Sequence, residues 1–365
     1  QAEDETISFT GGVKYITHLL PVLRGFAGAA EEVVRSLAVS SLSTLARQMQ
    51  SVEDLDELVQ SLLDADGTMY RVSACYLLPT IIQRILQLTN HTTDNTTDQQ
   101  TNLTPEAEKF LEIYSELSEG PLLWRRAPAV AMPEICRFLP QPDWVLEHFS
   151  QILSKFVLDE LETIRLYAPA AALGFLSGVS DFQKRRLRFE TDIVPLLSLL
   201  ADDNSWRVRC MVVEACPQAL DNLSTATLTA AADGPSDLEL SDVDETQRLT
   251  TSFVLKFLDF LRDEESEVRR SAVVNLSEVL QHLPPHPIAE DQPFKEKNEK
   301  EHIDETAKNP EECLSGSTVE RVLNRLTMTI KSDPNPHVKI AIVQSMSSLA
   351  EHPFPYTINP IVSRI

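Results

Sequence analysis

A fixed register of apolar positions recurs along the chain around seven basic residues. Positions sixteen and nine residues before each of these anchors, and ten residues after it, are apolar without exception. Offsets of −16, −12 and −9 share one face of a helix, and offsets of −1, +3 and +10 share one face of a second helix. The pattern therefore predicts a tandem series of helix pairs, each with its anchor in the second helix: Arg35, Arg71, Arg126, Arg165, Arg209, Arg269 and Lys339.

The spacing of the anchors indicates stacked repeats. Arg35 and Arg71 are 36 residues apart, and Arg126 and Arg165 are 39 apart, within the range where each repeat is one unit packed on its neighbours. We predict an all-α fold, an α-solenoid of about seven helix pairs plus the start of an eighth, which forms one curved rod over residues 1–365. The expected repeats are 13–48, 52–88, 105–139, 141–178, 181–222, 246–282 and 318–350.

Three polar stretches interrupt this register. We expect residues 89–104, 224–245 and 284–317 to be disordered inserts, because their compositions offer too little apolar surface to bury. Within the first of them, Thr104 followed by Pro105 predicts an N-cap and the first residue of a helix. The chain ends within the expected eighth repeat, so we expect a fragment of a longer solenoid, whose ends would carry capping repeats.

An acidic or small-residue turn separates the two helices of each pair. Acids there suit the first turn of the second helix, where backbone N–H groups lack partners. Stacking would align the anchors, so that each could pair with an acid of its own turn or of the adjoining turn. Exposed pairs contribute only about 0 to 1 kcal/mol each. We therefore expect the anchors to fix the stacking register and the buried apolar columns to stabilise the fold.

Composition narrows the function. A net charge of −23 argues against nucleic acid, which needs a basic surface, and favours partners with basic patches. No apolar run reaches the about eighteen residues of a membrane helix, and the first residues are acidic; we expect no membrane partner and a place in the cytoplasm, or also in the nucleus. Five cysteines without C-x-x-C spacing indicate reduced, buried thiols. The chain carries no nucleotide-binding or nucleophile motif, so we expect no enzyme, cofactor or metal site.

Several phrases in this register resemble a known family. They include Gly11-Gly-Val-Lys-Tyr15, Trp124-Arg-Arg126 and Ser205-Trp-Arg-Val-Arg209. The chain is similar, from about residue 11 onward, to the N-terminal to middle portion of the scaffolding A subunits of protein phosphatase 2A, which are rods of HEAT repeats. The resemblance implies a non-catalytic scaffold that docks regulatory B-type subunits on the row of intra-repeat turns. It also implies that the catalytic subunit binds through repeats beyond this chain.

Two basic and aromatic clusters are candidate docking residues. Trp206 precedes a predicted helix next to Arg207 and Arg209, and an exposed tryptophan beside arginine is typical of interfaces. Equally, Trp206 could pack on a neighbouring turn while Arg207 pairs within the row of anchors; the resemblance favours docking. The second cluster is Trp124, Arg125 and Arg126. Here the alternative, in which one arginine is paired and the other is solvated, is stronger on physical grounds. The family, however, uses the matching arginines for docking.

A set of acids in the turns is the third candidate. Such acids most often cap helices, but a row of them along one edge would also form a complementary track for basic residues of a partner. The set comprises Glu31, Glu32, Asp159, Glu160 and Glu162.

One turn departs from the family. Gly67 stands where the family usually has an aromatic residue, which weakens the comparison at the second repeat.

One other function stays open. The alternative is a transport receptor of the importin type, which would bind basic peptides on its concave face.

Overall fold

The computed structural model describes residues 13–90, 103–139, 142–179, 181–232, 240–282, 328 and 333–351. These residues form helices and connecting turns, and no strand occurs among them, which confirms the all-α prediction. The chain divides into two compact units, Gln1–Asp202 and Asp203–Ile365. A single rod over the whole chain therefore stays a prediction, and each unit is treated as a stack of its own.

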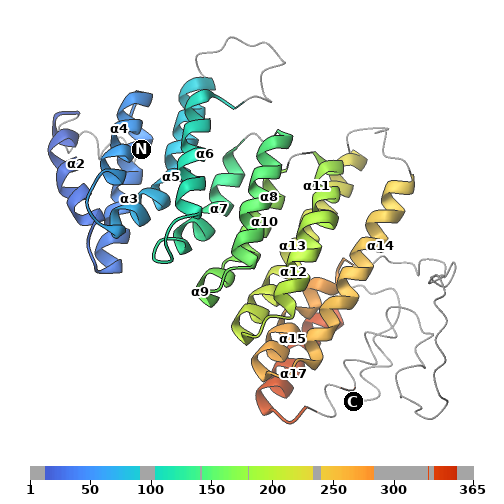
Figure 1. Ribbon diagram of the computed structural model, residues 1–365. Coiled ribbons are helices and arrows are strands. Elements are labelled where there is room, and N and C mark those ends of the chain that lie inside the picture. The colour runs from blue at the N-terminus through green and yellow to red at the C-terminus, as the bar shows by residue number, and fades with distance from the viewer. Residues whose placement is uncertain are drawn as a thin grey trace, which may run out of the picture. The chain divides into compact units, whose positions relative to one another are not determined.

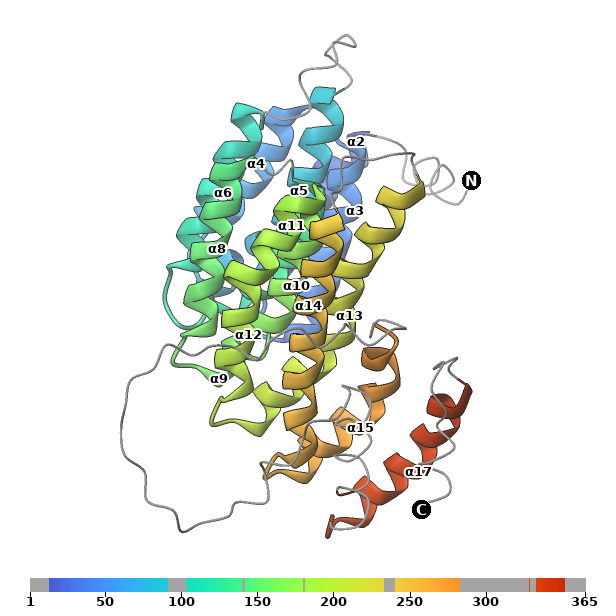
Figure 2. The same ribbon diagram turned by 90° about the vertical axis from the view of Figure 1, so that its right-hand side faces the viewer.

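Unit 1 contains four complete helix pairs and the first half of a fifth. The second helices of the pairs pack each on the next, and the first helices form a layer beside them, as Figures 1 and 2 show. The elements are α2 (Val13–Ala27), α3 (Glu32–Gln48), α4 (Val52–Leu63), α5 (Thr68–Asn90), α6 (Pro105–Ser118), α7 (Arg126–Phe138), α8 (Asp143–Val157), α9 (Glu162–Arg165), α10 (Ala168–Gly178), α11 (Phe182–Arg188), the π-helical η1 (Phe189–Ile193) and α12 (Val194–Ala201).

Unit 2 repeats this arrangement. Its second helices α13 (Trp206–Ala232), α15 (Ser266–Leu280) and α17 (Pro336–Glu351) pack in sequence, and α14 (Leu240–Phe257) continues into the 3₁₀ turn η2 (Leu258–Arg262) beside α15. The repeating unit predicted from the anchors is therefore present in both units.

The apolar columns form the core of each stack. In the second to sixth repeats, all three columns are buried: Leu55, Leu62, Ile81, Phe110, Leu117, Cys136, Phe149, Phe156, Phe175, Ile193, Leu200, Ala219, Phe253, Phe260 and Val279. The first repeat differs, because Leu19 and Phe26 are 41% and 50% exposed and no described helix covers that side of α2. In the last repeat the side chains of the column residues lie outside the described part.

The three polar stretches fall only in part on the described residues. Residues 224–232 and 240–245 are helical, and the disorder expected for 224–245 stays a prediction. The run from Thr225 to Ala232 is rich in alanine, which has the highest helix propensity, and it continues a helix already stacked in the core. Thr104 caps α6 as predicted, accepting a hydrogen bond from the Ala107 N–H at 3.3 Å with Pro105 at the first helical position. Residues 91–102 and 284–317 lie outside the described residues.

The anchors connect consecutive turns through both edges of a guanidinium group. Arg209 donates from Nη1 to the carbonyl of Asp203 in its own turn at 2.7 Å, and from Nε and Nη2 to both oxygens of Asp263 in the next turn at 2.7 and 2.8 Å. Arg269 repeats this geometry with Asp333 at 2.6 and 3.1 Å. We call each such arginine and aspartate pair a rung.

The aspartate of a rung also organises its own turn. The Oδ1 atoms of Asp263 and Asp333 accept the backbone N–H two residues later at 2.8 Å. These carboxylates therefore bind the preceding repeat and order the turn that leads into the following helix at the same time. The hydrogen bonds raise the pKa of Arg209 and Arg269 above the ordinary arginine value.

The expectation of exposed and weak pairs is wrong for these rungs. The side chains of Arg209 and Asp263 are 7% and 9% exposed, and those of Arg269 and Asp333 are 11% and 2% exposed. Spacing along the sequence placed the anchors beside acids but could not show that stacking removes both partners from water. Loss of one partner would leave a buried charge without compensation.

We expect Asp263→Asn to lower the free energy of unfolding by about 3 kcal/mol, because it leaves the buried Arg209 without its carboxylate. Glu264→Gln is the matched control: Glu264 lies 3.6 Å from Arg209 with 83% of its side chain exposed, so its loss should cost less than about 0.5 kcal/mol. Urea unfolding of both variants measures the difference. Equal effects of the two substitutions would show that the rung is not a stabilising element.

Candidate docking edge

The turns of unit 1 meet along one side of the stack. Arg71, at the start of α5, lies 5.3 Å from the centroid of the Trp124 ring in the turn before α7. Arg125 in that turn forms an ion pair of 2.8 Å with Asp159 in the turn before α9. These contacts link the second, third and fourth turns, and we call the side formed by the four turns of unit 1 the turn edge.

Trp124 lies against its own turn and is held there by a glycine. A Cβ atom at position 120 would overlap the indole ring, so the close approach requires glycine. The indole N–H is buried and has no hydrogen-bond partner among the described residues. Trp124 therefore acts mainly as a platform for Arg71, in a cation–π contact.

The two arginines after Trp124 have separate partners. Arg125 forms the rung to Asp159, whose Oδ1 accepts the Leu161 N–H at 2.9 Å. The anchor Arg126 instead lies 5.1 Å from the Tyr167 ring centroid and donates to the Tyr167 hydroxyl at 2.6 Å, which raises the pKa of Arg126. The rung is therefore formed by Arg125 and not by the anchor Arg126. Neither arginine is simply solvated, as one of the two alternatives predicted, because each binds a residue of the next repeat.

The acidic candidates divide into buried and exposed residues. Asp159 is buried in its rung, with a side chain 4% exposed, so it offers little surface to a partner. Glu31, Glu32 and Glu160 are exposed, while Glu162 is partly buried. The exposed acids lie on the turn edge, as the hypothesis of an acidic track requires, and their role in docking stays a prediction.

Two exposed leucines on the turn edge were not among the sequence-based candidates. Leu123, directly before Trp124, and Leu158, directly before Asp159, are each 72% exposed. A leucine in a turn where polar residues were expected is the signal that could have identified them. Together with the exposed glutamates they give the edge the mixture of apolar and charged groups found at protein interfaces.

The remaining candidates belong to the first turn of unit 2. Trp206 begins α13 and is 37% exposed, with the Arg207 guanidinium 5.3 Å from its ring centroid. Arg209 is 6% exposed and bound to Asp203 and Asp263. The candidacy of Arg209 for docking is therefore corrected to a structural role, because its rung removes it from the surface, whereas Trp206 and Arg207 remain accessible.

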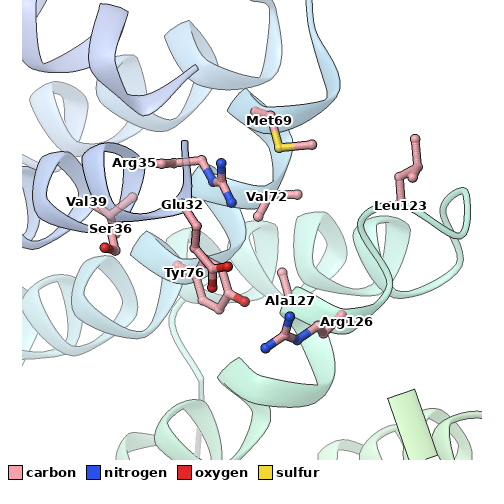
Figure 3. A pocket seen from close by; sticks show the side chains of 10 residues that line it. All are labelled: Glu32, Arg35, Ser36, Val39, Met69, Val72, Tyr76, Leu123, Arg126 and Ala127. Carbon is pink, nitrogen blue, oxygen red and sulfur yellow. The ribbon is translucent and has the colours of Figure 1, made fainter. Parts of the chain in front are cut away.

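A cavity of about 290 Å³ opens at the turn edge where α3, α5 and α7 begin. Figure 3 shows the side chains around it. Arg35, Arg126 and Glu32 supply charges, and Met69 and Tyr76 are among the residues that supply apolar and aromatic walls. Three turns of unit 1 therefore share one hollow that holds two guanidinium groups.

Other chemistry is scarce among the described residues. None of their histidines, cysteines and acids form a group of three or more suited to a metal ion, and no described helix is long and apolar enough to span a membrane. Cys75, Cys136 and Cys216 are buried thiols, and burial raises the pKa of each. Cys210 is only partly buried, with a pKa raised to about 11 mainly by burial.

Comparison with curated proteins gives two relatives. The regulatory A subunit of protein phosphatase PP2A from Saccharomyces cerevisiae is 27% identical over 220 residues, which are 57% of this chain and 31% of the yeast protein. The chain is a HEAT-repeat protein similar to the phosphatase 2A scaffold. The PP2A 65 kDa regulatory subunit of Drosophila melanogaster is 36% identical over 84 residues, which are 22% of this chain and 14% of the fly protein.

These matches confirm the predicted resemblance and set its extent. The HEAT repeats of this chain align with less than one third of the yeast relative's length. No family model matches the chain. Among solved structures, an engineered protein covers 94% of the chain at 13% identity with a TM-score of 0.30, which is too low to bear on the fold.

We expect Gly120→Ala to displace Trp124 and to lower the free energy of unfolding by about 1–3 kcal/mol, because the added methyl group overpacks the contact between turn and indole. Gly25→Ala is the matched control, since a Cβ there meets nothing within 4 Å and alanine favours a helix over glycine. Thermal unfolding and near-ultraviolet circular dichroism measure the stability and the tryptophan environment. An unchanged spectrum in Gly120→Ala would contradict this packing of Trp124.

Proposed function

We propose that this chain is a non-catalytic scaffold of a phosphatase 2A type assembly and that its intra-repeat turns hold a regulatory B-type subunit. The single observation that supports docking most directly is the exposure of Leu123 and Leu158 on the turn edge of unit 1. The apolar surface of these leucines stays in contact with water unless a partner covers it, and covering it favours binding. The names of the relatives supply the kind of assembly.

The mechanism of such a scaffold is geometric. In unit 1, arginine contacts join the second, third and fourth turns, so residues from separate repeats present a defined surface to a partner without rearrangement. In unit 1, the Arg71–Trp124, Arg125–Asp159 and Arg126–Tyr167 contacts would preorganise that surface. We assign the contact with a phosphatase catalytic subunit to no residue of this chain.

We expect the double substitution of Leu123 and Leu158 by alanine to weaken binding of a phosphatase 2A regulatory B-type subunit by at least about tenfold, because both side chains would be buried at the interface. Leu187→Ala is the control, since Leu187 is 56% exposed on α11, away from the turns. Calorimetric titration measures affinity, and thermal unfolding checks the fold. Affinity equal to that of the unsubstituted chain would exclude the turn edge as the docking surface.

In unit 2, we expect Trp206→Ala to weaken the same binding by about tenfold and Arg207→Ala to weaken it less, because the aromatic ring offers the larger area to bury. Pull-down with the regulatory subunit, followed by titration, measures both. Trp206→Phe should retain most of the affinity, since it keeps an aromatic ring. If both alanine variants bind as the unsubstituted chain does, the Trp206 and Arg207 pair is only a packing contact.

A further inference from the structure

Two turns of unit 1 lack the aspartate of a rung, because Ala65 and Gly120 stand in its place. Arg71 contacts Trp124 in the second of these turns, whereas Arg35 forms no hydrogen bond or ion pair with the turn at Ala65 among the described residues. Arg35 donates from Nη1 to the carbonyls of Ala29 and Ala30 in its own turn at 2.8 and 3.1 Å. Arg269 makes the same contacts with Asp263 and Glu264 at 2.8 and 2.9 Å, and its Nε and Nη2 hold Asp333. The residue that corresponds to Asp333 in the turn after Arg35 is Ala65, which has no carboxylate.

The acids that flank Ala65 do not replace the missing one. Asp64 and Asp66 are exposed, and neither forms an ion pair with Arg35 among the described residues. Arg35 is partly buried, and its only hydrogen bonds in the described part of the chain are those from Nη1. Its Nε and Nη2 edge is therefore open in a position where two other arginines of this chain hold a carboxylate.

Arg35 lines the cavity at the start of α3, α5 and α7, and Figure 3 shows its side chain there. The cavity also contains the Arg126 guanidinium and the Glu32 carboxylate, so its three charges sum to +1 in a chain of net charge −23. Met69 and Val72 provide apolar walls beside Arg35. Such walls strengthen an ion pair by excluding water from it.

We propose that the Nε and Nη2 edge of Arg35 receives one aspartate or glutamate side chain of the regulatory partner, which completes the missing rung from outside the chain. This inference rests on the proposed function, of which it specifies the partner chemistry. A single carboxylate fits better than a phosphate group, because Glu32 lies in the same cavity and repels a dianion more strongly. The internal rungs of Arg209 and Arg269 supply the geometry of the pair.

Arg35→Lys tests the open edge with the charge retained. The chain already uses lysine at the equivalent anchor, Lys339, so the fold should tolerate it, and equal melting temperatures check this. Lysine cannot offer two parallel donors, so we expect affinity for the regulatory subunit to fall about tenfold. Ala65→Asp should lower the affinity as well, by filling the edge from within, whereas the isosteric, neutral Ala65→Asn should not.

A double-mutant cycle identifies the partner's side of the pair. Each acidic interface residue of the regulatory subunit is changed to its amide, and each variant subunit is titrated against the unsubstituted chain and against Arg35→Lys. One amide variant should bind the unsubstituted chain about tenfold more weakly and should bind Arg35→Lys with nearly unchanged affinity. If Arg35→Lys binds as the unsubstituted chain does while Leu123 and Leu158 variants bind weakly, the inference is wrong and the proposed function stands. If the unsubstituted chain binds no regulatory subunit, both fall.

Discussion

The structure depends on the two-edged guanidinium group of the anchors. One edge binds carbonyl groups of the turn between the two helices of its own pair, and the other edge reaches the next repeat. Arg209 and Arg269 do both through hydrogen bonds of 2.6 to 3.1 Å. Apolar columns alone would allow neighbouring helix pairs to slide, because hydrophobic burial has no direction. The hydrogen bonds of a rung are directional and form in one register only. Because the rung is buried, any other register would leave its charges without partners.

Unit 1 obtains the same register with fewer carboxylates. Ala65 and Gly120 stand where unit 2 has Asp263 and Asp333, and the connections pass partly through aromatic rings instead. Arg71 uses Trp124, and Arg126 uses Tyr167. A ring contact occupies a face of the guanidinium, and Arg126 adds one hydrogen bond to the Tyr167 hydroxyl. Among the described residues, the turns of unit 1 are therefore joined by fewer ion pairs than those of unit 2.

The repeat, the helix pairs and most of the core could be predicted from the sequence, because apolar spacing is a property of each segment by itself. The predicted stacking also allowed each anchor to pair with an acid of its own turn or of the adjoining turn, and Arg209 and Arg269 bind aspartates of the adjoining turns. Their burial could not be predicted, since it arises only when two repeats stack. Nor could the shift of the rung from Arg126 to Arg125, which depends on Trp124 lying over Gly120 and on Tyr167 reaching back to Arg126.

The same reasoning explains why the candidate residues separated into two groups. Arg209 and Asp159 have the residue types of a docking surface, but their bonding capacity is used inside the stack, so they have little to offer a partner. Leu123, Leu158 and Arg35 attract less attention in the sequence, yet each has an exposed surface or an open edge. In a protein built from copies of one unit, a copy that lacks a contact made by the others leaves groups available to a partner. The proposed docking on the turn edge therefore rests on the departures from the repeat more than on the repeat itself.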